Sequence, residues 1–291
     1  MHLVCFGLGY VGLRLARALV ADGWTVTGTV RDPARAAQLC APGLEVLAFD
    51  GAANNPALCE RLAAASHVLG SIPPEDDGED PALGALAAAG ALPALRWAGY
   101  LSTTGVYGDT GGAWVDEDSP LQPHHDKAGR RVAAEAAWQD WHARTGVPLD
   151  ILRLAGIYGP GRSPLDQVRE GRARRIVKPD QVFSRIHVDD IVAAIRACIA
   201  RPNGVRTFNI CDDEPAPPQD VIAHAAALAG VDPPPEEPYE TAELSPTARR
   251  FYAANRRVSS ARIKVALGLA WRYPTYRSGL QALALADHSN R

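Results

Sequence analysis

Lysine, paired cysteines and long apolar runs are scarce in this sequence. Only three of its 30 basic residues are lysines, and its five cysteines are scattered without a Cys-x-x-Cys pair. Such cysteines indicate neither a disulfide framework nor a metal site, and they suit small buried side chains in a reducing compartment. No apolar run reaches the roughly 18 residues that a membrane-spanning helix needs, and no signal-peptide pattern is present. We therefore predict a cytoplasmic protein without a metal ion or a membrane partner.

The sequence also lacks a large excess of charge of either sign. The net charge of −3 over 291 residues gives no field that would attract nucleic acid. The hydrophobic fraction of 47% is that of an ordinary globular protein, so the chain can bury a substantial core. Its length allows one large domain or a core domain with a small second lobe. We expect its binding partner to be a small molecule.

The strongest motif lies near the N-terminus. An apolar run of strand length at 2–6 leads into a Gly-x-Gly-x-x-Gly turn at 7–12, which opens an amphipathic helix. In a dinucleotide site these glycines permit the tight turn, the approach of the pyrophosphate and the close packing of helix on strand, and the phosphates lie at the helix N-terminus. The motif alone also occurs in flexible turns, but here a second strand follows at 24–30. The predicted dinucleotide contacts are Gly7, Leu8, Gly9, Tyr10, Val11 and Gly12.

Strand-like apolar runs alternate with helical segments as far as residue 154. This alternation predicts an α/β fold with a doubly wound parallel sheet (Rossmann type), and the connection rules favour the strand order 3-2-1-4-5-6. Ligands of such a sheet bind at the carboxyl ends of the strands. The expected strands are 2–6, 24–30, 44–49, 67–72, 97–103 and 149–154, with a further helix at 188–200 and strand at 207–211.

The pattern loosens after residue 154. The segment 156–183 reads as irregular and basic, and prolines interrupt the tail at 215–218 and 233–238. We therefore predict a small C-terminal substrate lobe beside the dinucleotide-binding domain. The predicted domain is 1–155 completed by 184–211, and the predicted lobe is 156–183 with 212–291.

The end of the second strand bears on the identity of the nucleotide. NAD enzymes usually place a carboxylate there for the ribose hydroxyls, whereas this strand ends at Arg31, with Arg35 one helical turn further on. A guanidinium can hold a 2′-phosphate bidentately, so NADP is favoured. Asp32 keeps NAD possible, and both arginines can also be ordinary solvated charges. Asp50, after the third strand, is placed for the adenine amino group or for a turn. The residues that line the adenosine side by position are Ser71, Ile72 and Pro73.

Several segments resemble the extended short-chain dehydrogenase/reductases, which form the NAD-dependent epimerase/dehydratase family. The resemblance recurs in order over nearly the whole chain, and it is nearest to a bacterial, atypical subset of uncharacterised oxidoreductase-like members with the run Ser-Thr-Thr-Gly-Val-Tyr-Gly. It implies hydride transfer to or from a nicotinamide. The segments that carry it are 7–12, 102–108, 116–117, 153–162 and 186–191.

The family's catalytic residues can be placed only in part. By resemblance Thr103 takes the Ser/Thr position after the fifth strand and can bond a substrate oxygen, or a backbone group instead, with Ser102 beside it on the cofactor side. The family's Tyr-x-x-x-Lys pair falls on Lys127 and Arg131, counted back from Glu135, and no tyrosine here precedes a lysine by four residues. An arginine can hold ribose hydroxyls but cannot act as a base. Lys127, close to another cation, is the candidate acid or base, with a solvated lysine as the alternative.

Weaker candidates surround these positions. Tyr107 and Tyr158 can replace the missing phenol, although packing beneath a loop is the interpretation we prefer. The pair at 124–125 does not indicate a metal, because adjacent histidines point apart and no third ligand is spaced to join them. The basic loop 172–178 can bind an anion or simply be solvated.

Two functions remain open from the sequence. The first is an NADP-dependent oxidoreductase or epimerase that acts on a small substrate with a hydroxyl or carbonyl group. The alternative is a catalytically degenerate NAD(P)-binding protein that serves as a redox sensor or scaffold. The family resemblance also suggests a homodimer through the helix at 127–144.

Overall fold

The computed structural model of the chain describes residues 1–52 and 55–289. Its contacts divide the chain into two compact units, which are described separately. The first unit is 1–103, 125–153 and 192–208, and the second is 104–124, 154–191 and 209–291. The predicted division differs from these units chiefly at 104–124 and 184–191, which the sequence assigned to the dinucleotide domain. Residues 53–54 of the predicted domain and 290–291 of the predicted lobe lie outside the described residues.

A parallel sheet forms the centre of the first unit. Within the described residues its strands are β1 (His2–Phe6), β2 (Thr25–Val30), β3 (Leu44–Ala48), β4 (His67–Gly70), β5 (Trp97–Thr103), β7 (Leu149–Leu154) and β11 (Val205–Ile210). Their order is β11-β7-β5-β4-β1-β2-β3, and the pairs that link β3 through to β5 are parallel. The predicted order 3-2-1-4-5-6 is confirmed, and a seventh strand extends it beyond β7.

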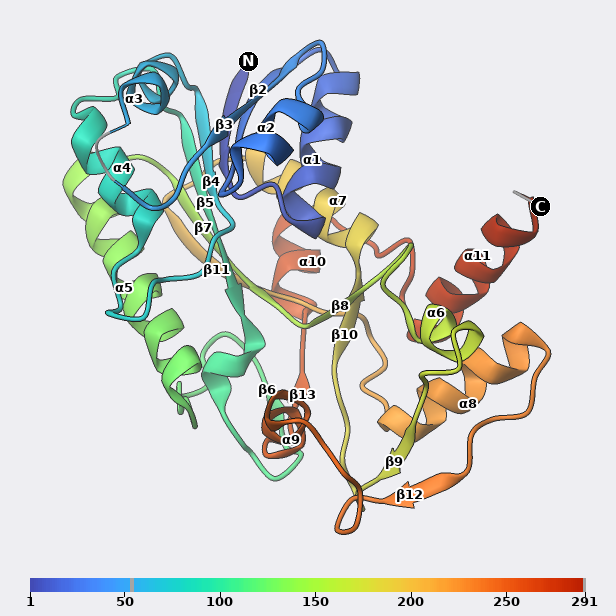
Figure 1. The fold of residues 1–291 in the computed structure, drawn as a ribbon. Helices are drawn as coiled ribbons and strands as arrows, with labels where there is room; N and C mark the ends of the chain where they lie inside the picture. The colour runs from blue at the N-terminus through green and yellow to red at the C-terminus, as the bar shows by residue number, and fades with distance from the viewer. Residues whose placement is uncertain (53–54, 290–291) are drawn as a thin grey trace. The chain divides into compact units, whose positions relative to one another are not determined.

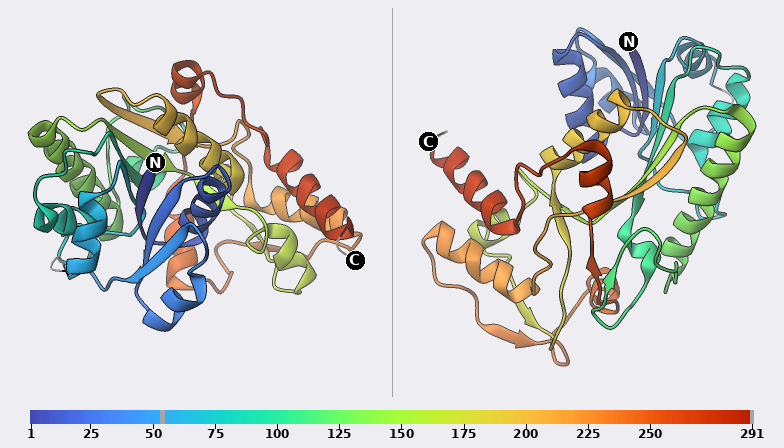
Figure 2. Two further views of the ribbon diagram at one scale, coloured as in Figure 1. Left: turned by 90° about the horizontal axis from the view of Figure 1, so that it is seen from above. Right: turned by 180° about the vertical axis from the view of Figure 1, so that it is seen from behind.

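Helices cover both faces of this sheet, as Figures 1 and 2 show. On one face lie α1 (Tyr10–Ala21), α2 (Pro33–Leu39) and α7 (Val188–Ala200), and on the other lie α3 (Pro56–Ala63), α4 (Pro81–Ala89) and α5 (Asp126–Thr145). Because both faces are covered, β1, β4 and β5 are almost wholly buried, and this is why they read as continuous apolar runs in the sequence.

Proline and a capping side chain together begin three of these helices. Asp32 accepts a hydrogen bond from the Ala34 N–H, and Asn55 accepts one from the Leu58 N–H. In α2, α3 and α4 a proline takes the first helical position, where its missing N–H has no partner to lose. Each of these helices therefore begins at a signal that is local in the sequence.

The carboxylate of Asp80 is buried in the core on the α3, α4 and α5 face. Asp80 caps α4 through the N–H groups of Ala82 and Leu83, and its second oxygen accepts a hydrogen bond from the indole of Trp138 at 3.1 Å. Trp138 stacks on Tyr100 with the ring centroids 5.6 Å apart. Burial raises the pKa of Asp80. Its three hydrogen-bond donors, two at the start of α4 and one on α5, link these two helices.

The second unit consists of short elements around two apolar clusters. The larger cluster includes Tyr158, Val221 and Leu280, and the smaller one includes Ile176 and Tyr252. Its described elements are the 3₁₀ turn η1 (Thr104–Tyr107), β6 (Trp114–Val115), β8 (Gly156–Tyr158), α6 (Pro164–Arg169), β9 (Arg175–Val177), β10 (Arg185–His187), α8 (Pro218–Ala229), β12 (Glu236–Pro238), α9 (Pro246–Tyr252), β13 (Arg257–Val258), α10 (Ala261–Leu267) and α11 (Tyr276–Ser289).

The prediction that 156–183 is irregular was wrong. This segment contains β8, α6 and β9, and α6 begins with a capping box between Ser163 and Asp166. Strands of three residues are too short to show a period in the sequence, and their pairs β8–β10 and β9–β12 join residues far apart in the chain.

The length and hydropathy of the helices bear on whether the chain can cross a membrane. Across residues 1–52 and 55–289, no helix is both long enough and apolar enough to cross a bilayer.

Candidate functional site

The glycine turn between β1 and α1 builds one wall of the site. Gly7 has φ +97°, a conformation that side chains disfavour, and a Cβ there would lie 2.7 Å from the Ile72 side chain. A Cβ on Gly12 would lie 2.3 Å from the Gly7 carbonyl oxygen. Gly9 differs from both, because a Cβ there would meet nothing within 4 Å. The first and third glycines are therefore required by packing, whereas the second leaves open space.

The turn is fixed to β2 by backbone and side-chain bonds. Thr29 accepts the Gly7 N–H through its hydroxyl at 3.0 Å and the Leu8 N–H through its carbonyl at 2.8 Å. The Leu8 side chain occupies the space that a Cβ on Gly28 would fill. Helix α1 then begins at Tyr10 with Gly9 as its N-cap, so the first-turn N–H groups are presented at the turn. Sequence reasoning missed Thr29 and Gly28, although both belong to the strand that the motif predicted.

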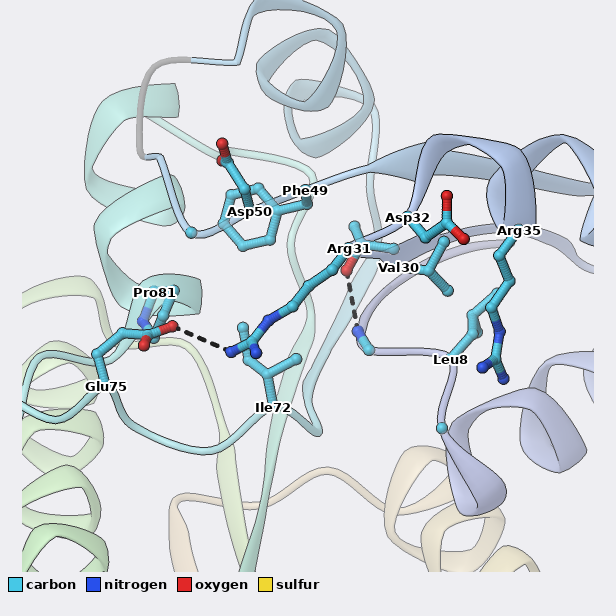
Figure 3. Close-up of a pocket in the computed structure, with 14 residues that line it drawn as sticks. Leu8, Val30, Arg31, Asp32, Arg35, Phe49, Asp50, Ile72, Glu75 and Pro81 are labelled. Carbon is cyan, nitrogen blue, oxygen red and sulfur yellow. Dashed lines mark hydrogen bonds and ion pairs between the residues drawn. The ribbon is translucent and has the colours of Figure 1, made fainter.

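A pocket of about 300 Å³ lies in front of this turn (Figure 3). It is formed by residues at or after the carboxyl ends of four parallel strands, β1 to β4, which is where a doubly wound sheet binds ligands. Its lining residues are Gly7, Leu8, Gly9, Thr29, Val30, Arg31, Asp32, Arg35, Phe49, Asp50, Gly51, Ile72, Glu75 and Pro81.

The structure brings most, but not all, of the predicted cofactor residues to this pocket. Ile72 lines it, whereas Ser71 and Pro73 are not among the lining residues. Tyr10 begins α1, and Val11 and Gly12 are buried beneath the turn. Ser102 is buried as well, and its hydroxyl bonds to Glu135 on α5.

The charged residues of the pocket are of both signs. Two guanidiniums and three carboxylates line it, so its formal charge is −1 rather than positive. Arg31 points across the pocket to the carboxylate of Glu75 at 3.4 Å, and Arg35 points toward the Leu8 side (Figure 3). Asp50 accepts the Ala52 N–H at 3.0 Å, which is the turn that the sequence offered as its alternative role. Glu75 was missed, because an acidic segment of the sequence gives no sign of which carboxylate faces a ligand.

The residues at the family's catalytic positions lie at the end of β5 and on α5. Thr103 is the last residue of β5 and is half-buried. Lys127 is the second residue of α5 and is exposed. Arg131, one turn further on, donates to the Leu101 carbonyl at 2.7 Å and to the Tyr100 hydroxyl at 3.0 Å. The arginine at the family's lysine position is thus bonded to the strand beside it.

A buried ion pair lies beneath these residues. Glu135 accepts hydrogen bonds from the guanidinium of Arg153 on β7, the shortest at 2.7 Å, and another from the Ser102 hydroxyl. Both charged side chains are at most 6% exposed. Each charge is therefore paired and hydrogen-bonded, which is the condition under which a protein tolerates it in the interior.

Tyr107 and Tyr158, the two tyrosines considered as replacements for the missing catalytic phenol, are both buried in the second unit. Tyr107 is buried and its hydroxyl donates to Asn209 at 2.8 Å. Tyr158 is buried as well, and burial raises the pKa of its phenol, so it is a poor base near neutrality. Both side chains are packed in the interior of the second unit, which is the interpretation that the sequence favoured.

The remaining candidates also have local partners. His125 caps α5 by accepting the Ala128 N–H at its Nδ1. In the basic loop, Arg175 bonds Glu236 and Lys178 bonds the Tyr252 carbonyl, while Arg172 and Arg174 pair with Glu170 and Glu237. The three arginines of the loop are thus paired with carboxylates, and its lysine is bonded to a backbone carbonyl.

A glycine turn that opens a helix beside a pocket, at the carboxyl edge of a parallel sheet of this order, is the arrangement of a Rossmann fold. The sequence profile of the NAD dependent epimerase/dehydratase family matches residues 3–211, and the chain belongs to this family. The family resemblance drawn from the sequence is thereby confirmed.

Two curated relatives share much of the chain. "Protein YeeZ" of Escherichia coli (strain K12) is 31% identical over 244 residues, which cover 78% of this chain and 84% of that protein. A "3-diazoavenalumate denitrifying reductase" from Streptomyces sp is 29% identical over 96% of this chain and 98% of its own length.

Two solved structures show the same fold. A functionally unknown conserved protein from Silicibacter pomeroyi DSS is 47% identical, with a TM-score of 0.87 over 98% of this chain and 99% of that one. A dTDP-glucose 4,6-dehydratase from Bacillus anthracis, solved in complex with NAD, is 17% identical, with a TM-score of 0.80 over 100% of this chain and 97% of that one.

Proposed function

We propose that the protein is an NADP-dependent oxidoreductase or epimerase that acts on a small substrate with a hydroxyl or carbonyl group. The observation that carries this proposal is the pocket between the glycine turn and the ends of β2 and β3. Family membership supports a nicotinamide dinucleotide as the cofactor, and the reductase name of the Streptomyces relative supports hydride transfer.

The residues present fit such a cofactor. The open space at Gly9 and the first-turn N–H groups of α1 suit a pyrophosphate, and Phe49, Ile72 and Pro81 offer an apolar surface for an adenine. Arg31 and Arg35 favour NADP over NAD, although the Bacillus anthracis dehydratase was solved with NAD. When bound, the cofactor supplies or accepts a hydride.

The chain's own residues then position the substrate and move its proton. The Thr103 hydroxyl donates a hydrogen bond to the reacting oxygen, and Lys127 delivers or removes the proton at that oxygen. Arg131 remains a candidate ligand of the ribose hydroxyls, and its bonds to Leu101 and Tyr100 hold its guanidinium at the end of β5.

A substrate screen that follows NADPH oxidation, with wild type and three variants, tests this proposal. Thr103→Ala should lower kcat by about 10² with an unchanged NADPH Kd, and Thr103→Ser should restore most of the rate. Lys127→Ala should lower kcat as well, whereas an unchanged rate would remove Lys127 from the mechanism. Full activity of Thr103→Ala on every accepted substrate would contradict the role given to the hydroxyl.

A degenerate binding protein is the second candidate. Two observations favour it: Arg131 is bonded to β5, and the tyrosines offered as substitutes are buried with other partners or with a raised phenol pKa. Such a protein should bind NADPH equally well as wild type, Thr103→Ala and Lys127→Ala. None of the three should oxidise NADPH, whichever carbonyl substrate is added.

The remaining predictions concern assembly and location. A homodimer through α5 and a cytoplasmic location stay predictions from the sequence. Light scattering of the purified chain at two concentrations measures the first, and a mass of one chain at both concentrations would contradict it.

A further inference from the structure

We propose that Glu75 limits the preference of this pocket for a 2′-phosphorylated dinucleotide, by holding Arg31 in an ion pair and leaving Arg35 as the phosphate ligand. The inference rests on the proposed function, since it concerns the choice between NADPH and NADH at the same site. Its basis is the placement of one carboxylate among the residues that line the pocket.

Glu75 is presented to the pocket by an ordered turn. Its N–H donates to the Glu79 carbonyl at 2.8 Å, and its own carbonyl accepts the Gly78 N–H at 3.1 Å. Arg130 on α5 bonds Asp76, the next residue, at 2.9 Å. The turn ends at Asp80, which is buried and caps α4. The backbone that carries Glu75 is therefore held by hydrogen bonds within the turn, and the side chain extends from it to Arg31.

The Glu75 carboxylate occupies the space between two strand ends. It lies 3.4 Å from the Arg31 guanidinium, and its Oε1 would be 3.6 Å from a Cβ built on Gly51. Figure 3 shows the Arg31 side chain extended across the pocket above Ile72 to reach it. A phosphate that binds Arg31 has to displace this carboxylate or lie beside a second negative charge, and either costs binding free energy.

Arg35 is not committed in this way. Within residues 1–52 and 55–289 it forms no ion pair, and its guanidinium is turned away from that of Arg31 (Figure 3). Its charge is available to a phosphate without loss of a partner. The sequence alone gives no reason to distinguish the two arginines. In the structure, binding of a phosphate to Arg31 costs the free energy of its ion pair with Glu75, whereas binding to Arg35 does not.

Titration of NADPH and NADH into wild type, Glu75→Gln and Glu79→Gln at one ionic strength tests the inference. Glu75→Gln should raise the ratio of NADPH to NADH affinity about three- to tenfold, as expected for removing one half-exposed charge beside an anion. Glu79→Gln removes the same charge from the same turn outside the pocket, and it should change the ratio less than twofold.

Two arginine variants show whether Glu75 acts through Arg31. In an Arg31→Gln background, Glu75→Gln should change the ratio less than twofold, and Arg35→Gln alone should weaken NADPH binding more than Arg31→Gln alone. An equal effect of Glu75→Gln and Glu79→Gln, or an undiminished effect in the Arg31→Gln background, overturns the inference while nucleotide binding persists. Binding of neither nucleotide by wild type contradicts the proposed function itself.

Discussion

At the scale of single residues, the three glycines of the turn have separable roles. A Cβ on Gly12 would meet a backbone oxygen, which cannot move without moving the turn, whereas a Cβ on Gly9 would enter open space. Sequence motifs group the three residues together. The structure distinguishes Gly12, which packing requires, from Gly9, which leaves room for a ligand.

Gly12→Ala and Gly9→Ala should therefore fail in different ways. Gly12→Ala should lose about 1–3 kcal/mol of unfolding free energy through overpacking against Gly7. Gly9→Ala should unfold like wild type but bind NADPH at least tenfold more weakly, because its methyl group occupies the space offered to the phosphates. Urea unfolding and nucleotide titration of both variants measure this. Unimpaired NADPH binding by Gly9→Ala would place the phosphates elsewhere.

Asp212 is a buried carboxyl in the second unit that makes stability depend on pH. It is 1% exposed, and its Oδ2 has no hydrogen-bond partner among the described residues. Burial raises its pKa to about 8, against about 3.9 in an unfolded chain. The folded state therefore holds this proton at neutral pH. The stability that it contributes is complete below pH 4 and is lost as the pH rises toward 8.

Asp212→Asn imitates the protonated carboxyl and should remove this dependence. Below pH 4 the variant and wild type should be similarly stable. Between pH 4 and 8 the variant should gain on wild type by at most about 1.4 kcal/mol per pH unit, and above pH 8 the difference should level off. Urea unfolding at pH 5, 7 and 9 gives the difference. A difference that does not change with pH would show that Asp212 is charged in the folded state.

At the scale of elements, the buried pair of Glu135 and Arg153 joins α5 to β7, and Ser102 adds β5. This arrangement fixes the helix that carries Lys127 and Arg131 against the strand that carries Thr103. The catalytic candidates are thus held by a polar contact as well as by apolar packing.

Breaking one partner of this pair should be more harmful than removing both. Arg153→Met leaves Glu135 buried without its countercharge and should cost about 3–5 kcal/mol of unfolding free energy. The double variant Arg153→Met, Glu135→Met should recover much of that loss, because no unpaired charge remains. Denaturant unfolding of the two variants makes the comparison. A double variant no more stable than Arg153→Met would show that shape, not charge, dominates.

The elements differ in how well the sequence predicts them. The helices that begin at Pro33, Pro56 and Pro81 were predictable, because a capping side chain and a proline mark each start locally. The three-residue strands β8 and β9 were not, since they exist only through pairing with distant segments. The predicted strand 67–72 ends instead at Gly70, and the chain beyond it leads to Glu75.

At the scale of the whole molecule, the connection rules predicted the sheet. Because connections between parallel strands are short and cross over in the right-handed sense, few strand orders are allowed. The observed order is one of them. The signs of charge at the pocket could not be predicted in this way. Glu75 and Arg31 are 44 residues apart, so their pairing depends on how the ends of β2 and β4 are placed. Similarly, the partners of Arg131 are set by β5 rather than by the motif on its own helix.

The proposed function requires that the glycine turn and the ends of β2 and β3 form a dinucleotide site. Calorimetric titration of the purified wild-type chain with NADPH and with NADH measures whether they do. We predict saturable binding of one molecule per chain, with NADPH bound more tightly than NADH. Tighter binding of NADH would contradict the role given to the arginines, and no heat with either nucleotide would contradict the site.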